Sequence, residues 1–251
     1  MSNVNGTKIN QLLRGWPSGA VYATSWLGKH GINSSLLVRY RNGHWLEKIG
    51  RGAVSRTGDP IEWTSGLYAI QKQLALGVHA GGRTALEMAG FAHTLRMGKP
   101  RVSLFGPPRL KLPAWFRKRD WGARIDYYMT NLFSAGSRLG LLNRPVGRYS
   151  IVVSAPERAI LEALYLVPYA LDAEEAKHLV EGLATLRPNL VQKLLKDCQS
   201  VKAKRLLMAL AENARHPWVQ RVNTRQVNFG TGKRVIVPGG WLHPKYLVTL
   251  P

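Results

Sequence analysis

The chain has 251 residues, of which 45% are hydrophobic, enough for two or three domains that each bury a core. Its 36 Lys and Arg residues outnumber 14 Asp and Glu residues, and the net charge of +22 indicates a polyanionic partner, for which we expect nucleic acid rather than a membrane. A single cysteine excludes an intramolecular disulfide and any multi-cysteine metal site, and the lack of a long apolar run and of a signal-peptide pattern favours a cytoplasmic protein.

The first predicted elements are a short helix over residues 7–13 and a short strand over residues 20–22. Residues 24–43 then have the pattern of two helices joined by a tight turn. Gly31 is free to adopt the left-handed conformation that stops the first helix, which covers residues 25–30. Asn33, or one of the two serines after it, is expected to cap a second helix that ends at residues 42–43, with an inward face formed by Leu36, Leu37 and Tyr40.

A basic hairpin follows the two helices. Residues 45–49 and 53–56 are predicted strands, and residues 50–52 form a turn with Arg51 at its tip. Helix, turn, helix and hairpin in this order are typical of a winged helix-turn-helix, which binds double-stranded DNA through its second helix and its wing. The side chains that we expect to contact phosphates or base edges are Lys29, Asn33, Ser34, Ser35, Arg39, Arg41, Lys48, Arg51 and Arg56.

A domain boundary is predicted directly after the hairpin. Asp59 has the position of a helix cap, Pro60 that of the first helical residue, and Glu62 follows three residues after the cap. We therefore predict a DNA-binding domain over residues 1–58 and a C-terminal domain over residues 59–251, which a further boundary near residue 150 would subdivide.

The middle of the chain carries two patterns that need an interpretation. Gly81 and Gly82 precede a short predicted helix, but the spacing GxxxxGK[ST] of a phosphate-binding loop is absent, so we expect a structural glycine turn. Between predicted strands at 101–105 and 123–128, three aromatic residues alternate with basic ones. This run is interpreted either as an additional contact for nucleic acid or a partner, or as buried aromatic residues surrounded by solvated basic side chains. Its basic side chains are Lys111, Arg117, Lys118 and Arg119.

The C-terminal part is predicted to be largely helical. A strand over residues 149–153 leads into a capping box at Ser154–Glu157 and then into helices over residues 158–166, 173–183, 188–195 and 201–213. Short strands are predicted at 227–229, 234–237 and 246–250. No pair of carboxylates converges as in an acid/base catalyst, and the seven histidines lack metal-ligand spacing, so we expect no enzyme, no metal and no cofactor.

The fold class predicted from these elements is α+β, with an N-terminal winged helix-turn-helix followed by a larger mixed α/β C-terminal domain that contains a helical array. Five blocks of the sequence then resemble, in order, the AbiEi family of antitoxins from bacterial type IV toxin–antitoxin systems. The blocks are WLEKIGRGAVSR (45–56), GGRTALEMAGF (81–91), VSLFGPPRLKLPAWF (102–116), SAPERAILEALYLVP (154–168) and GTGKRVIVPGGWLHPKYLVTLP (230–251).

This resemblance implies an N-terminal winged helix that binds inverted repeats in the double-stranded DNA of its own promoter. It also implies a C-terminal domain that counteracts a cognate nucleotidyltransferase toxin, and a protein that is not an enzyme. Two alternatives stay open: a stand-alone transcriptional regulator whose second domain senses a ligand or partner, and an RNA-binding protein that uses the basic–aromatic run at 109–121.

Overall fold

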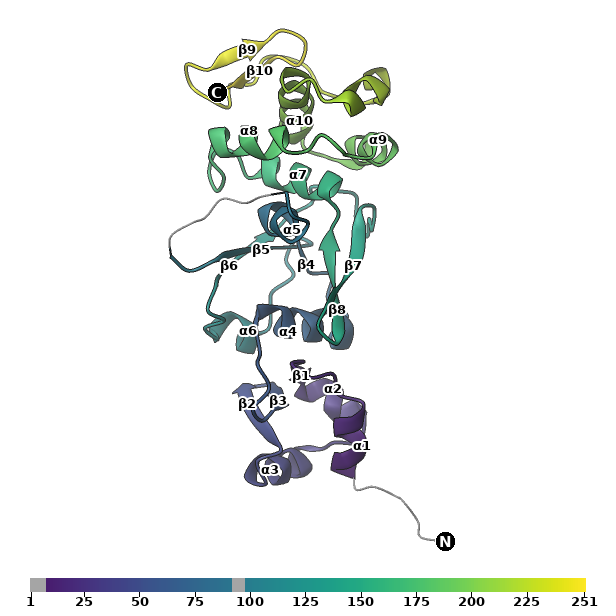
Figure 1. Cartoon of the computed structure of the whole chain (residues 1–251), viewed down its shortest axis with the longest axis vertical. Helices are drawn as coiled ribbons and strands as arrows, with labels where there is room; N and C mark the ends of the chain where they lie inside the picture. Colours follow the sequence, from purple (N-terminus) through teal and green to yellow (C-terminus); the bar gives the residue numbers. More distant parts are fainter. Residues whose placement is uncertain (1–7, 92–97) are drawn as a thin grey trace. The chain divides into compact units, whose positions relative to one another are not determined.

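The computed structural model describes residues 8–91 and 98–251 (Figure 1). The described residues form two compact units, each with its own interior. The first unit comprises residues 8–78, 110–124 and 143–152, and the second comprises the remaining described residues. Each unit is therefore assembled from segments that are distant in the sequence. No helix in the two described ranges is long and apolar enough to cross a membrane.

The N-terminal part of the first unit is a winged helix-turn-helix. The helices are α1 (Lys8–Arg14), α2 (Thr24–Lys29) and α3 (Ser34–Asn42), and the strands are β1 (Tyr22–Ala23), β2 (Leu46–Gly50) and β3 (Ala53–Arg56). The strands form an antiparallel sheet in the order β1-β3-β2, in which the short strand β1 pairs with the second strand of the wing.

Local signals place the two helices of the helix-turn-helix. Gly31 has a φ of +81°, a conformation that glycine adopts without strain, and it follows the end of α2 as predicted. The Asn33 side chain accepts a hydrogen bond from the backbone N–H of Leu36 at 2.9 Å and caps α3. Leu37 and Tyr40 then turn into a core that also contains Leu27, Trp16 and Leu46.

The predicted helix start at Asp59 is wrong. The next helix, α4, covers Trp63–Tyr68 and continues as a π-helical segment, η1 (Ala69–Gln73). Its capping box joins Glu62 and Ser65 instead. The Asp59 carboxylate is used elsewhere, because it accepts a hydrogen bond from the backbone N–H of Gly19 at 2.7 Å. The side chain that the sequence pattern assigned to the helix cap thus binds Gly19, which lies 40 residues away in the sequence.

A five-stranded sheet has the strand order β6-β5-β4-β8-β7. Its strands are β4 (His79–Ala80), β5 (Arg101–Gly106), β6 (Arg124–Met129), β7 (Leu141–Val146) and β8 (Tyr149–Ser154). Strand β4 pairs antiparallel with β5 and parallel with β8. The predicted strands at 101–105, 123–128 and 149–153 are confirmed, whereas β7 was not predicted. Two short helices, α5 (Gly82–Met88) and α6 (Ala114–Lys118), lie between these strands in the sequence.

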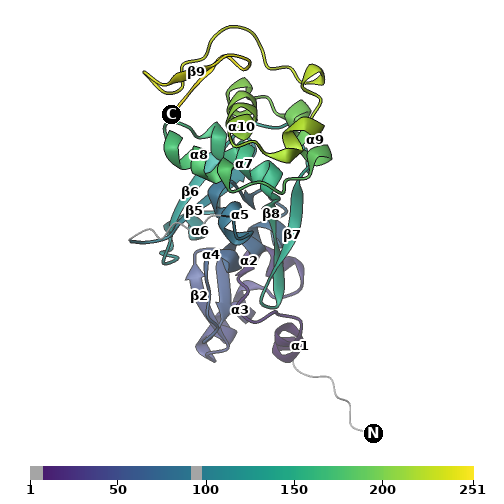
Figure 2. The ribbon, with the colours of Figure 1, turned by 45° about the horizontal axis from the view of Figure 1, so that its top comes forward.

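The second unit contains the predicted helical array, formed by α7 (Pro156–Tyr165), α8 (Ala173–Glu181), α9 (Pro188–Asp197) and α10 (Val201–Asn213). Figure 2 shows α10 beside α7 and α8. The main core includes apolar side chains of these three helices, such as Leu164, Val180 and Leu207. Cys198 is buried in this core, as expected for a small apolar residue.

Two details of the array differ from the prediction. The Ser154–Glu157 capping box does not form, since α7 has Ala155 at its cap position without a side-chain hydrogen bond. Ser154 donates to Glu162 at 2.8 Å, and Glu157 accepts from the backbone N–H of Arg187 at 2.9 Å. Both polar side chains therefore make tertiary hydrogen bonds instead of capping α7.

The C-terminal segment contains two short 3₁₀ helices, η2 (Pro217–Arg221) and η3 (Thr224–Gln226), and the hairpin of β9 (Trp241–His243) with β10 (Val248–Leu250). The predicted final strand is confirmed in part. The strands predicted at 227–229 and 234–237 do not form, and only an isolated bridge joins Arg234 to Val248. Side chains satisfy part of the remaining backbone. Arg205 donates to the carbonyl of Phe229 at 2.7 Å, and the hydroxyl of Thr249 accepts from the N–H of Ile236 at 2.8 Å.

Candidate nucleic-acid interface

The outward face of α3 is polar and basic. Ser34, Ser35, Arg39 and Arg41 are exposed, while Leu37 and Tyr40 on the opposite side are buried. Arg39 and Arg41 lie in the last turn, where a positive charge complements the helix dipole. Helix α3 therefore presents donors for phosphates and base edges on a helix whose rotation is fixed by its core contacts. Asn33 is exposed as well, but its side-chain oxygen is already occupied by the cap.

The end of α2 supplies a further cation. Lys29 is exposed in its last turn. The helix ends against His30, whose ring stacks on that of Trp26 with centroids 3.6 Å apart and whose Nδ1 lies 2.8 Å from the Trp26 carbonyl oxygen. This stacking fixes the direction in which the chain leaves α2 for the turn.

The wing is the third part of the surface. Lys48 and Arg51 are exposed on it, and Arg51 is flanked by Gly50 and by Gly52, whose φ of +108° permits the tight turn at the tip. Arg56 is half-buried, and its Nη1 donates to the carbonyl of Trp16 at 3.3 Å. Arg56, like the helix cap Asn33, therefore has a structural contact within the winged domain.

Two exposed apolar side chains on this surface were missed by the sequence reasoning. Val38 on α3 is 47% exposed, and Trp45 just before the wing is 51% exposed. Val38 does not share the helical spacing of the buried residues Leu37 and Tyr40, and this spacing could have predicted its exposure. Apolar side chains such as valine are among those that contact the methyl group of thymine in the major groove.

The basic–aromatic run around α6 has a buried aromatic side. Trp115, Phe116 and Trp121 are all buried, so they offer no platform on which bases could stack. The basic side chains lie outside: Lys111, Arg117 and Lys118 are exposed, and Arg119 is half-buried with its guanidinium 5.3 Å from the centroid of the Trp121 ring. What remains available to a polyanion is charge rather than stacking.

A buried polar cluster surrounds Glu162 in the second unit. Its carboxylate accepts from the Nε of Arg158, the hydroxyl of Ser154 and the N–H of Gly82, and lies 2.8 Å from Nε2 of His79. Burial acts to raise the pKa of Glu162, but the charges and hydrogen bonds of His79 and Arg158 outweigh it, so that the pKa lies below its ordinary value. With every oxygen occupied and no exposed side, this carboxylate holds elements together and is closed to a substrate.

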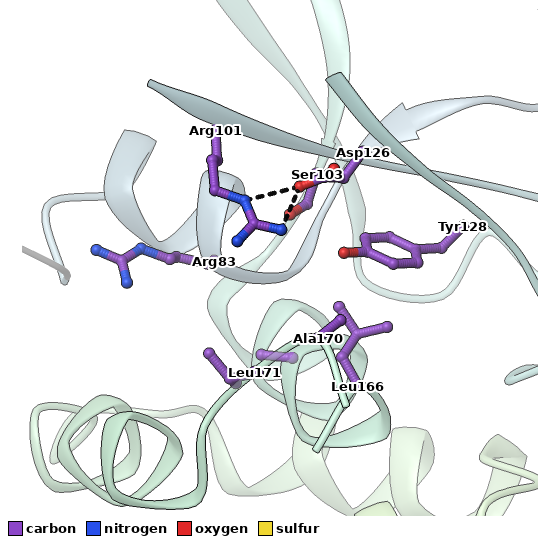
Figure 3. A pocket seen from close by; sticks show the side chains of 9 residues that line it. Arg83, Arg101, Ser103, Asp126, Tyr128, Leu166, Ala170 and Leu171 are labelled. Carbon is purple, nitrogen blue, oxygen red and sulfur yellow. Dashed lines mark hydrogen bonds and ion pairs between the residues drawn. The ribbon is translucent and has the colours of Figure 1, made fainter. Parts of the chain in front are cut away.

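A small cavity in the second unit is shown in Figure 3, where Arg101 reaches towards Asp126 above an apolar floor that includes Leu166 and Leu171. The Arg101 Nη2 lies 2.8 Å from Oδ2 of Asp126. The volume of about 30 Å³ is far below the roughly 300–1,000 Å³ of a typical ligand pocket. Across residues 8–91 and 98–251, no group of three His, Cys, Asp or Glu residues is arranged to hold a metal ion.

Comparisons with known proteins agree with the pattern in the sequence. Residues 5–97 match the model of a family described as "Transcriptional regulator, AbiEi antitoxin N-terminal domain", and residues 99–251 match "Transcriptional regulator, AbiEi antitoxin, Type IV TA system". Curated proteins give no match.

Among solved structures, the crystal structure of the RV2827C protein from Mycobacterium tuberculosis is similar to this chain, with a TM-score of 0.58 and 16% sequence identity. The alignment covers 96% of this chain and 88% of that chain. At this identity the likeness shows a shared fold alone, and it supports the mixed α/β architecture with an N-terminal and a larger C-terminal domain. The two family models together span nearly the whole sequence, and the chain belongs to the AbiEi antitoxin family of type IV toxin–antitoxin transcriptional regulators.

Proposed function

We propose that this protein is a cytoplasmic, non-enzymatic antitoxin that represses its own operon. In this proposal the winged helix binds inverted repeats in the double-stranded promoter DNA, and the C-terminal domain, residues 59–251, counteracts a nucleotidyltransferase toxin. The observation that carries the proposal is the exposed basic face of α3 beside a wing with Arg51 at its tip, in a chain of this family.

The residues divide by the kind of contact that their chemistry suits. Ser34, Ser35, Arg39 and Arg41 enter or flank the major groove, where hydrogen bonds to base edges carry sequence information. Val38 adds an apolar contact to a thymine methyl group. The remaining cations contact the phosphate backbone of the DNA, which positions the protein but carries no sequence information. They are Lys29, Lys48, Arg51 at the wing tip, and Arg56, which also donates a hydrogen bond to the carbonyl of Trp16.

Binding to the upstream DNA tests this division. Fluorescence anisotropy is measured with a duplex from the region upstream of the gene and with a scrambled duplex of equal composition, from 50 to 200 mM salt. We expect tighter binding of the upstream duplex. Arg39→Ala should reduce that preference, whereas Lys29→Ala should weaken both duplexes equally and lower the salt slope by about one unit. Equal affinity of the wild-type protein for both duplexes would contradict the proposal that the protein is a sequence-specific repressor.

Toxin neutralisation needs a separate assay in cells. The full chain is co-expressed with the adjacent gene product, and growth is scored with and without the antitoxin. Rescue of growth supports the proposal, whereas a neighbouring gene unrelated to nucleotidyltransferases, or a failure to rescue, favours a stand-alone regulator. The full chain is required because residues 110–124 and 143–152 belong to the same compact unit as the winged helix, so that a cut near residue 59 would expose the core of that unit.

The burial of the aromatic residues argues against the RNA-binding alternative. Base stacking needs accessible rings, and Trp115, Phe116 and Trp121 are buried. The exposed basic side chains of the same segment are compatible with phosphate contact, which both DNA and RNA offer. Competition between duplex DNA and single-stranded RNA distinguishes the two partners.

A further inference from the structure

The wing of the first unit is packed against α6, a helix that lies more than fifty residues further along the chain. The closest approach is at Gly50, where an added Cβ would lie 2.9 Å from Cβ and 3.2 Å from Cα of Trp115. A Cβ at Gly52 would lie 3.5 Å from Cδ1 of the same ring. Both glycines that flank Arg51 therefore lie against Trp115. Figures 1 and 2 both show α6 next to β2.

The same segment also packs against α4, through Phe116 and Trp121. A Cβ at Gly66 would lie 2.7 Å from Phe116 and 2.8 Å from Trp121, so these two rings fill the space directly above the glycine. The indole N–H of Trp121 donates to the carbonyl of Phe116 at 2.8 Å, which closes the segment on itself. The aromatic side chains of residues 110–124 are thus part of the interior of the first unit.

The outward side of this segment is strongly basic. Lys111 and Lys118 are exposed, and neither has an ion-pair or hydrogen-bond partner within residues 8–91 and 98–251. Arg117 and Arg119 are held more tightly, since the Nε of Arg117 donates to the carbonyl of Leu112 at 3.1 Å and Arg119 lies over the Trp121 ring. Two long cations without a partner in the described residues are therefore carried on a segment that is packed against the tip of the wing.

We propose that residues 110–124, the segment that includes α6, form a second DNA-contacting element, in which Lys111 and Lys118 bind phosphates of the duplex beside the wing while Trp115 fixes the direction of Arg51. This inference rests on the proposed function and extends its DNA contact to a segment outside the N-terminal 58 residues. Lysine is a point charge without the planar fork that reads guanine, so these contacts add affinity and no sequence preference. The buried rings of the segment leave phosphates as the part of the nucleic acid that it can bind.

The test uses the full-length double variant Lys111→Gln, Lys118→Gln and the anisotropy assay with upstream and scrambled duplexes. Loss of two phosphate contacts should lower the salt slope by about 1.8 and weaken binding roughly 60-fold at 0.1 M salt. Both duplexes should weaken by the same factor, leaving their affinity ratio unchanged. The matched control is Lys193→Gln, Lys233→Gln, which removes the same charge from exposed positions of the second unit and should leave the slope near the wild-type value.

A slope in the α6 variant equal to that of the control would overturn the inference. Loss of binding to a single-stranded RNA of equal length, with duplex binding unchanged, would also overturn it and assign the lysines to RNA. A wild-type protein that fails to prefer the upstream duplex refutes the proposed function instead, so the two failures are distinguishable.

A second variant tests the connection between α6 and the wing. Gly50→Ala places a methyl group against the backbone of Trp115, which cannot yield as a flexible side chain would, and so separates α6 from the wing. In this background the two Lys→Gln changes should cost much less than in the wild-type protein. Gly15→Ala is the control, because its Cβ meets nothing closer than 3.9 Å. Full additivity of the Gly50 and lysine changes would contradict the proposed coupling.

Discussion

Replacing Glu162 with glutamine tests how the second unit is held together. The substitution preserves shape but leaves the buried guanidinium of Arg158 without a counter-charge, and the side-chain exposures of the two partners are 7% and 1%. Breaking a buried ion pair in this way typically costs about 3–5 kcal/mol. We expect Glu162→Gln to lower the free energy of unfolding by an amount in this range.

Urea denaturation followed by circular dichroism measures the change. The matched control is Glu157→Gln, whose partner Arg187 has a side chain that is 64% exposed, so that solvent can compensate the arginine. We expect the control to cost about 1–2 kcal/mol, mainly through lost hydrogen bonds. A cost for Glu162→Gln no larger than that of the control would refute the conclusion that the cluster is structural.

The pH dependence gives a second readout of the same substitution. Because the folded-state pKa of Glu162 lies below its ordinary value of 4.5, its ionised form contributes stability at higher pH, and this contribution is lost as the pH falls below that value. The wild-type protein should therefore lose stability more steeply than Glu162→Gln between pH 5 and the folded-state pKa. Parallel curves for the two proteins would show that Glu162 titrates as it does in the unfolded chain.

Three further substitutions or reactions test local features. Asn33→Ala should cost about 1 kcal/mol of unfolding free energy by removing the cap of α3, whereas Ser34→Ala should change it little, and reversed values in urea melts would contradict the cap assignment. Asp59→Ala should cost about 1 kcal/mol because the N–H of Gly19 loses its acceptor, whereas no loss of stability would argue against this contact. Burial raises the pKa of Cys198 to about 11, so a thiol reagent at pH 8 should label it only after unfolding, and rapid labelling of the native protein would contradict its burial.

The parts of the fold that sequence predicted well are those determined by neighbouring residues. Gly31 and Asn33 act within one helical turn, and both have the predicted role. The polar side chains at Asp59 and Glu157 looked like caps for the same local reason. Both cap predictions are wrong, because the backbone N–H groups of Gly19 and Arg187, which are distant in the sequence, donate to these carboxylates in the folded chain.

Strand β7 and the association of α6 with the wing could not be read from local pattern. Strand β7 lacks the alternation of buried and exposed residues and contains Pro145, so neither periodicity nor propensity marked it. The contact between Trp115 and Gly50 joins two segments with no shared local signal. The sequence therefore identified the basic residues of both segments, but only the folded structure shows that the two segments are in contact.

The most direct test of the central claim is repression of a promoter–reporter fusion by the full-length variant Arg39→Ala, Arg41→Ala in cells that also express the adjacent gene product. Both side chains are exposed on α3, so the variant should fold normally. We predict that repression is lost while growth is still rescued. Repression at the wild-type level would contradict the assignment of α3 as the element that reads the operator.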